Sequence, residues 1–226
     1  MPLKSDLQHW GSVAKTLHWL VVLLILVQGA LGLVMVGLPK KPFILAFYSL
    51  HKSIGMTALI LAALRLGWRA FDPRPQEPAS TPHWQALGAR AGHALLYLLL
   101  FAVPLSGWWF DSLAALRPLY FFGLFEIPPL ATPNPGMKAF ARGAHEWLFW
   151  LLIAVALGHA AMAFVHQFIR KDSTLSRMLP GRRTLATSAA TRMSESTSAT
   201  LEKLHVERTI PAASPVAGSA RRKPGA

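Results

Sequence analysis

The stretch LFWLLIAVALGHAAMAFVHQFI, residues 148–169, decides the fold because it runs for 22 residues without a charged side chain. A helix of about 20 apolar residues is enough to cross the hydrocarbon core of a bilayer, which is about 30 Å thick. Residues 16–39 and 91–110 form two more uncharged runs, of 24 and 20 residues. The sequence therefore predicts three clear membrane-spanning helices.

A fourth span is predicted over residues 44–69. Residues 42–51 and 53–64 are uncharged, and Lys52 alone separates them. The alternative for this segment is a re-entrant or interfacial helix that does not cross the bilayer. With four spans, the expected fold class is an all-α membrane protein, a four-transmembrane-helix bundle whose two termini lie on the same side.

The composition of the 226-residue chain agrees with this class. Hydrophobic residues make up 53% and charged residues only 15%, whereas soluble domains contain about 25% charged residues. The chain has no cysteine, which excludes disulfides, iron–sulfur clusters held by thiolates and thioether-attached haem. Nine histidines remain as the strong ligands for transition metals. The formal net charge of +13 fits loops on the cytoplasmic face of a membrane, so nucleic acid is not an expected partner.

The distribution of Lys and Arg predicts the orientation of the bundle. The N-terminal segment, the second loop and the segment after the fourth span carry eleven: Lys4, Lys15, Arg65, Arg69, Arg74, Arg90, Arg170, Lys171, Arg177, Arg182 and Arg183. The first and third loops, counted with Lys52, carry six: Lys40, Lys41, Lys52, Arg117, Lys138 and Arg142. Cytoplasmic loops are enriched in Lys and Arg, so we expect both termini in the cytoplasm.

Composition also divides the chain into two parts. Residues 1–183 form the predicted membrane domain, whereas residues 184–226 are rich in Ala, Ser, Thr, Pro and Arg and are predicted to be a disordered basic tail. Residues 72–82 are predicted to be an extended, proline-rich connector. The third loop, which contains Pro128, Pro129 and Asn134-Pro135-Gly136, is expected on the outer surface, with a short helix as one option.

Six histidines fall in or at the predicted spans: His18, His51, His93, His145, His159 and His166. Ionisable residues inside a membrane are rare and indicate function. His145 and His159 are 14 residues apart. At about 100° and 1.5 Å per residue, both point the same way and lie about 21 Å apart along one helix. Two planar cofactors can therefore be stacked at two depths between the helices of the bundle.

Depth in the membrane predicts how the histidines pair. Helix direction places His18 with His159 toward the inner face, and His51 with His145 toward the outer face. His166 is an alternative to His159, but it lies about 31 Å along the helix from His145. That separation would push two metals to opposite membrane surfaces, so we prefer His159.

Paired histidines in an apolar bundle without cysteine suit b-type haem that is not covalently attached. The alternatives are hydrogen bonds between helices or a proton relay. Two axial histidines leave no free position on the iron, so such a haem transfers electrons and does not bind oxygen as an inner ligand. Two of them at different depths would form a transmembrane path for electrons.

The chain resembles the bacterial cytochrome b561 family over about residues 10–181. The matching stretches are VAKTLHW (13–19), YSLHKSIG (48–55), GHALLY (92–97), PLSG (104–107), AHEW (144–147), HAA (159–161) and KDSTLSRMLP (171–180). The resemblance implies four transmembrane helices in the bacterial inner membrane, two haem b groups and electron exchange with the quinone pool. It implies His18 and His159 as ligands of the inner haem, and His51 and His145 as ligands of the outer haem.

One branch of that family is similar to superoxide oxidase, which passes electrons from superoxide to ubiquinone. On that reading Lys52 and Arg142, helped by Lys138 and Arg117, attract an anion at the outer face; contacts with haem propionates are the alternative. His93 and His166 are candidates for a quinone site, with ordinary interfacial histidines as the alternative.

The predicted function is therefore a di-haem cytochrome that carries electrons between the outer membrane face and the quinone pool, with ubiquinone as an exchangeable substrate. Superoxide or a periplasmic redox protein is the expected outer partner, and superoxide:ubiquinone oxidoreductase is the candidate enzyme activity. One alternative is a cytochrome b anchor subunit that takes electrons from a partner dehydrogenase or hydrogenase. The other is a haem-free four-helix transporter.

Overall fold

A computed structural model describes residues 2–7, 9–39, 41–73, 75, 82–114, 117–172, 174–179 and 196–197. In these ranges four helices are long enough and apolar enough to cross a membrane. They are α1 (Ser12–Gly37), α2 (Ile44–Phe71), α3 (His83–Ala114) and α4 (Pro135–Phe164), and α4 continues as the π-helical turn η1 (Val165–Ile169). The predicted fold class, a bundle of four membrane-spanning helices, is confirmed.

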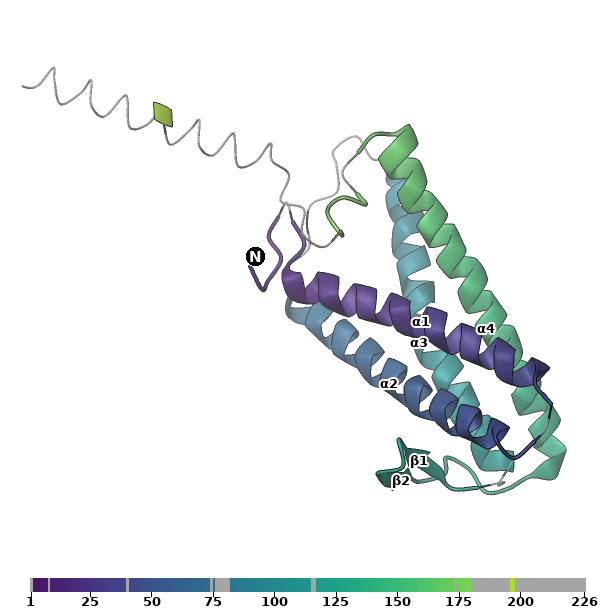
Figure 1. Ribbon diagram of the computed structural model, residues 1–226. Coiled ribbons are helices and arrows are strands. Elements are labelled where there is room, and N and C mark those ends of the chain that lie inside the picture. The colour runs from purple at the N-terminus through teal and green to yellow at the C-terminus, as the bar shows by residue number, and fades with distance from the viewer. Residues whose placement is uncertain are drawn as a thin grey trace, which may run out of the picture. The chain divides into compact units, whose positions relative to one another are not determined.

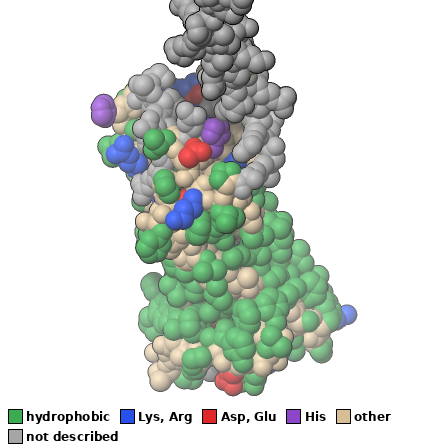
Figure 2. Space-filling view, turned by 90° about the vertical axis from the view of Figure 1, so that its left-hand side faces the viewer, with side chains coloured by type: hydrophobic (Ala, Val, Ile, Leu, Met, Phe, Trp, Pro, Cys, Tyr) green, Lys and Arg blue, Asp and Glu red, His purple; other side chains and the backbone are tan. Residues whose placement is uncertain are grey.

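The helices pack in the order in which they follow one another along the chain. Contacts join α1 to α2, α2 to α3 and α3 to α4, and Figure 1 shows α1 running beside α2 and α3 beside α4. Helix α2 runs without a break through Lys52, as expected of a full span. Large apolar side chains such as Leu26, Leu98 and Leu157 stay more than 60% exposed on the bundle. Figure 2 shows one face of the bundle covered mainly by hydrophobic side chains, which suits contact with lipid.

Two helices are longer than their uncharged cores predicted. Helix α3 begins at His83, and α4 begins at Pro135, so Lys138 and Arg142 lie in the first turns of α4 and not in a loop. The side chain of Asn134 caps α4 by accepting a hydrogen bond from the Met137 N–H at 3.3 Å. Asn before Pro is a typical start of a helix, because Asn caps the free N–H groups and Pro fits the first turn.

In its described residues 117–134, the third loop forms a β-hairpin and not the short helix that was one option. Strands β1 (Leu119–Phe121) and β2 (Phe125–Ile127) pair antiparallel. Phe122 and Gly123 have φ values of 48° and 76°, the positive values that a type I′ hairpin turn requires. The buried hydroxyl of Ser53 in α2 accepts a hydrogen bond from the Phe122 N–H at 2.9 Å. It lies 3.2 Å from the Tyr120 carbonyl, so it fixes the hairpin on the N-terminal part of α2. This end of the bundle is the one predicted to face outward and is called outer below, and the opposite end is called inner.

At the opposite end, the chain segments that flank the bundle fold against it. The carboxylate of buried Asp72 accepts hydrogen bonds from the backbone N–H and the hydroxyl of Ser5, at 2.8 and 2.5 Å. The indole N–H of Trp19 donates to the Met178 carbonyl at 2.9 Å. Most of the predicted connector at 72–82, and the predicted tail at 184–226 except 196–197, lie outside the described residues.

Candidate functional site

The four histidines paired by predicted depth are brought together in those pairs. His51 of α2 and His145 of α4 have ring centres 6.3 Å apart. His18 of α1 and His159 of α4 have ring centres 6.4 Å apart. Each pair therefore joins helices that are distant in sequence, and α4 contributes one member to both.

The spacing of both pairs fits a metal held between two imidazoles. A metal–nitrogen bond of about 2 Å on each side, plus about 1 Å from each nitrogen to its ring centre, gives roughly 6 Å between ring centres. Among the described residues, no group of three or more His, Asp or Glu side chains could hold a bare metal ion. The pairs therefore suit a metal whose remaining ligands come from a macrocycle, as in haem with two axial histidines.

His145 is held in the orientation that a metal ligand needs. Its ring Nδ1 lies 3.0 Å from the Val103 carbonyl and 3.1 Å from the Ser106 hydroxyl. Because a carbonyl accepts only, Nδ1 carries the proton and the lone pair is on Nε2. A hydrogen bond of this kind fixes the tautomer and orientation of metal-binding histidines. The PLSG stretch around Pro104 therefore supports the ring of His145.

Glycines of the facing helices leave space for the two outer rings. A Cβ atom at Gly107 would lie 2.9 Å from Cε1 of His145, and one at Gly32 would lie 3.3 Å from Cε1 of His51. The Nδ1 atom of His51 is buried without a hydrogen-bond partner in the described part of the chain. Buried polar atoms are almost always paired, so an unpaired ring nitrogen is consistent with a site for a bound group.

The side chain of Gln28 in α1 contacts the backbone of α2 beside the His51 ring. Its amide nitrogen donates to the His51 carbonyl at 2.6 Å. This contact ties the middle of α1 to the turn of α2 that carries the outer histidine. Sequence reasoning missed it, because one amide in an apolar span gives no indication of its partner.

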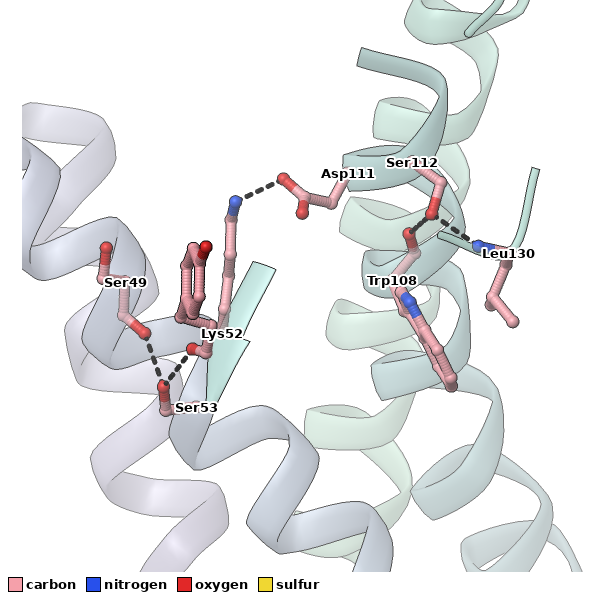
Figure 3. Close-up of polar contacts among 8 residues, drawn as sticks. Ser49, Lys52, Ser53, Trp108, Asp111, Ser112 and Leu130 are labelled. Atoms are coloured by element: carbon pink, nitrogen blue, oxygen red, sulfur yellow. Dashed lines mark hydrogen bonds and ion pairs between the residues drawn. The ribbon is translucent and has the colours of Figure 1, made fainter. Parts of the chain in front are cut away.

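Lys52 is paired with an acid that sequence reasoning also missed. Its Nζ lies 2.5 Å from the carboxylate of Asp111 in α3, and the two side chains point toward each other in Figure 3. Asp111 directly follows the uncharged run 91–110, so it lies at the outer end of α3, at about the same predicted depth as Lys52. This shared depth was the sequence signal that could have indicated the pair. The pair borders a cavity of about 180 Å³ that Lys52 lines together with Tyr48, Ser49 and Arg117.

The other predicted site residues lie in different places. Arg142 lines a separate recess of about 440 Å³ along the outer turns of α4, together with Lys138 and Glu146. His93 of α3 has its ring centre 5.1 Å from that of His159, so it packs against the inner pair. His166 does not join that pair in the described contacts, because its Nδ1 lies 2.5 Å from the carboxylate of Asp172.

Asp172 lies just past the membrane-spanning part of the chain. Burial alone would raise the pKa of its carboxyl, but hydrogen bonds with Thr174 and His166 outweigh this effect and hold the pKa below its usual value. The backbone N–H of Thr174 donates to this carboxylate at 3.0 Å. The His166–Asp172 pair therefore sits where the inner end of the bundle meets water.

Comparisons with known proteins agree along the whole helical region. The family model described as prokaryotic cytochrome b561 matches residues 9–181. Cytochrome b561 homolog 2 of Escherichia coli (strain K12) is 37% identical over 186 residues, which cover 79% of this chain and 95% of that protein. Homolog 1 of the same strain is 32% identical over 173 residues, covering 74% and 94%. “Probable superoxide oxidase CybB” of Yersinia pestis is 28% identical over 169 residues, covering 74% and 93%.

Proposed function

Because the chain belongs to the prokaryotic cytochrome b561 family, a family of haem-binding membrane proteins of electron transport, we propose that it carries electrons between the outer membrane face and the quinone pool. It is a multi-pass bacterial membrane protein with four spans. Membership in a cytochrome family removes the haem-free transporter as an alternative. The observation that carries the proposal is the presence of two histidine pairs, with ring centres 6.3 and 6.4 Å apart, on one shared helix.

We assign His51 and His145 to an outer haem b and His18 and His159 to an inner one. When bound, the two groups supply one-electron transfer centres at two depths. The chain's own contribution is to hold four neutral imidazoles in fixed orientations and to surround them with apolar helices that exclude water. If each histidine pair holds an iron as proposed, the two imidazoles leave no free position for an oxygen ligand.

The proposed outer substrate is superoxide, and a periplasmic redox protein is the second candidate. One relative is named as a superoxide oxidase. In the proposed reaction two superoxide anions each lose one electron and become dioxygen. One ubiquinone accepts both electrons and two protons and becomes ubiquinol. Arg117, Lys138 and Arg142 near the outer end favour the approach of an anion, whereas the charge of Lys52 is offset by Asp111.

Quinone reduction is proposed at the inner end. His93 lies against the inner histidine pair, and His166 pairs with Asp172 at the edge of the bundle. Imidazole nitrogens can donate hydrogen bonds to quinone oxygens and accept them from quinol hydroxyl groups. We therefore keep both histidines as candidates for the quinone site. The excess of Lys and Arg at this end supports a cytoplasmic location for both termini.

Two measurements on purified protein test the proposal. A reduced-minus-oxidised spectrum with a haem assay should give two haem b groups per chain. Addition of superoxide with a soluble ubiquinone analogue should then give quinol without any partner protein. Reduction that requires a copurifying dehydrogenase or hydrogenase would favour the anchor-subunit function. One haem per chain, or none, would overturn the proposed two-centre arrangement.

A further inference from the structure

Arg65 lies within the bundle, close to the inner histidine pair. Arg65 belongs to α2, within the membrane-spanning segment Ile44–Phe71. A guanidinium group stays protonated under all ordinary conditions, so it brings a full positive charge into this region. Charged groups in a membrane interior are costly unless an opposite charge or strong hydrogen bonds compensate them. The partners of Arg65 therefore decide what this residue does.

The partners that the described residues provide are neutral. One guanidinium nitrogen donates to the Ala14 carbonyl at 3.4 Å, near the long limit for a hydrogen bond. The hydroxyl of Tyr97 in α3 is a second polar group that interacts with this guanidinium. None of the ion pairs found among the described residues includes Arg65. A guanidinium offers five N–H donors in a planar fork, so most of its capacity is unused.

In the described contacts, the surroundings of Arg65 add positive charge and include no acidic side chain. Arg65 lies close enough to His18, His93 and His159 to act on all three electrostatically. Arg69, one turn further along α2, lies over the Tyr97 ring, with its guanidinium carbon 5.6 Å from the ring centre. Two arginines and one tyrosine thus face the inner histidine cluster from two helices. The outer end differs, because Lys52 there has a carboxylate partner at 2.5 Å.

We propose that Arg65, supported by Arg69 and Tyr97, forms an anion-binding site whose ligand is a carboxylate carried by the inner haem. This inference rests on the proposed function, since it requires a haem at the His18–His159 pair. Haem b has two propionate groups, and the planar fork of Arg matches a carboxylate with two parallel hydrogen bonds. The phosphate of a lipid headgroup is the other source of an anion at this depth, and the experiment below separates the two.

The test uses the holoprotein with both haems, in nanodiscs made of phosphatidylcholine alone or with phosphatidylglycerol. Redox-difference infrared spectra report the carboxylate bands, and potentiometric titration reports each haem separately. Arg65→Leu should shift the carboxylate bands and weaken reduction of the inner haem about tenfold, or about 59 mV for one electron. Arg65→Lys should give smaller changes. Lys41→Leu removes a charge from an exposed loop and should leave both readouts at the inner haem unchanged.

Each outcome bears on the proposal. Shifts that are equal in both lipid compositions support it. Unchanged carboxylate bands in Arg65→Leu overturn it, and shifts that occur only with phosphatidylglycerol overturn it in favour of lipid phosphate. If Arg65→Leu loses the inner haem, the haem content of two further variants decides. An inner haem kept by Arg65→Lys but lost by Arg65→Gln supports a bound anion. Equal inner-haem content in these two variants overturns the proposal. If the protein binds two haems but does not reduce quinone, the proposed function is wrong and the anion-site proposal is unaffected.

Discussion

The two ends of the helical bundle hold similar histidine pairs in different electrostatic surroundings. At the outer end, His145 is fixed by a backbone carbonyl and the nearby cation Lys52 is neutralised by Asp111. At the inner end, His159 has a third imidazole 5.1 Å away and Arg65 nearby, with no carboxylate partner in the described contacts. Lys52 beside the outer pair therefore has an acidic partner before any cofactor binds, whereas Arg65 beside the inner pair has none in the described contacts.

This difference has a consequence for electron transfer. Reduction adds a negative charge to a haem, so a nearby cation without a partner stabilises the reduced form and raises the reduction potential. In the proposed arrangement a single haem carboxylate offsets only one of the two guanidinium groups of Arg65 and Arg69, and the remaining positive charge favours electron movement from the proposed outer haem to the proposed inner one. That direction agrees with a donor outside and a quinone acceptor inside.

The largest expected effect is loss of one haem at a time. His51→Ala or His145→Ala should lose the outer haem and keep most of the inner, and His18→Ala or His159→Ala should do the reverse. Haem content per chain, with resolved potentials, measures this. His166→Ala is the matched control in η1, the continuation of α4, and should keep both haems. An empty inner site in His166→Ala, but not in His159→Ala, would show that our choice of ligand is wrong.

A second test removes the charge balance of the outer end. Asp111→Asn leaves Lys52 without a negative partner in a site where the two side chains are 24% and 16% exposed. We expect a loss of about 2 kcal/mol in stability, typical of a hydrogen bond to a charged group, and a higher potential of the outer haem. Thermal unfolding and redox titration measure the two effects. The double variant Lys52→Met/Asp111→Leu should recover stability, and failure to do so would argue against the pair.

A third test asks how tightly the outer site is packed. Gly107→Ala places a methyl group 2.9 Å from Cε1 of His145, so the ring must move. Overpacking of this kind costs about 1–3 kcal/mol, and we expect a changed spectrum and potential of the outer haem with the inner haem unaffected. Gly88→Ala is the control on the same helix, because nothing lies within 4 Å of its new methyl group. Equal spectra for the two variants would contradict the packing role of Gly107.

Much of this fold could be predicted from the sequence, because membrane spans depend on composition and length, which a sequence displays directly. The histidine pairs could be predicted too, since depth follows from helix direction and a rise of about 1.5 Å per residue. The β-hairpin could not, because its turn places Phe122 at a φ of 48°, a value that a bulky residue seldom adopts. The Lys52–Asp111 pair and the support of His145 depend on which helices are neighbours and how they are rotated.

The smallest expected effect concerns the His166–Asp172 pair at the inner edge. A carboxyl whose pKa is lowered by folding adds stability above its unfolded pKa of about 3.9, and this contribution disappears as the pH falls through the lower folded value. Asp172 has such a lowered pKa, so Asp172→Asn should be less stable than the wild type at pH 7. This difference in stability between the two proteins should become smaller toward pH 3. The Asp172 side chain is 23% exposed at the edge of the bundle, where solvent screens its charge, so the change should be a small shift in the thermal unfolding temperature. If the stability difference between Asp172→Asn and the wild type stays constant between pH 7 and pH 3, then the negative charge of Asp172 does not stabilise the fold.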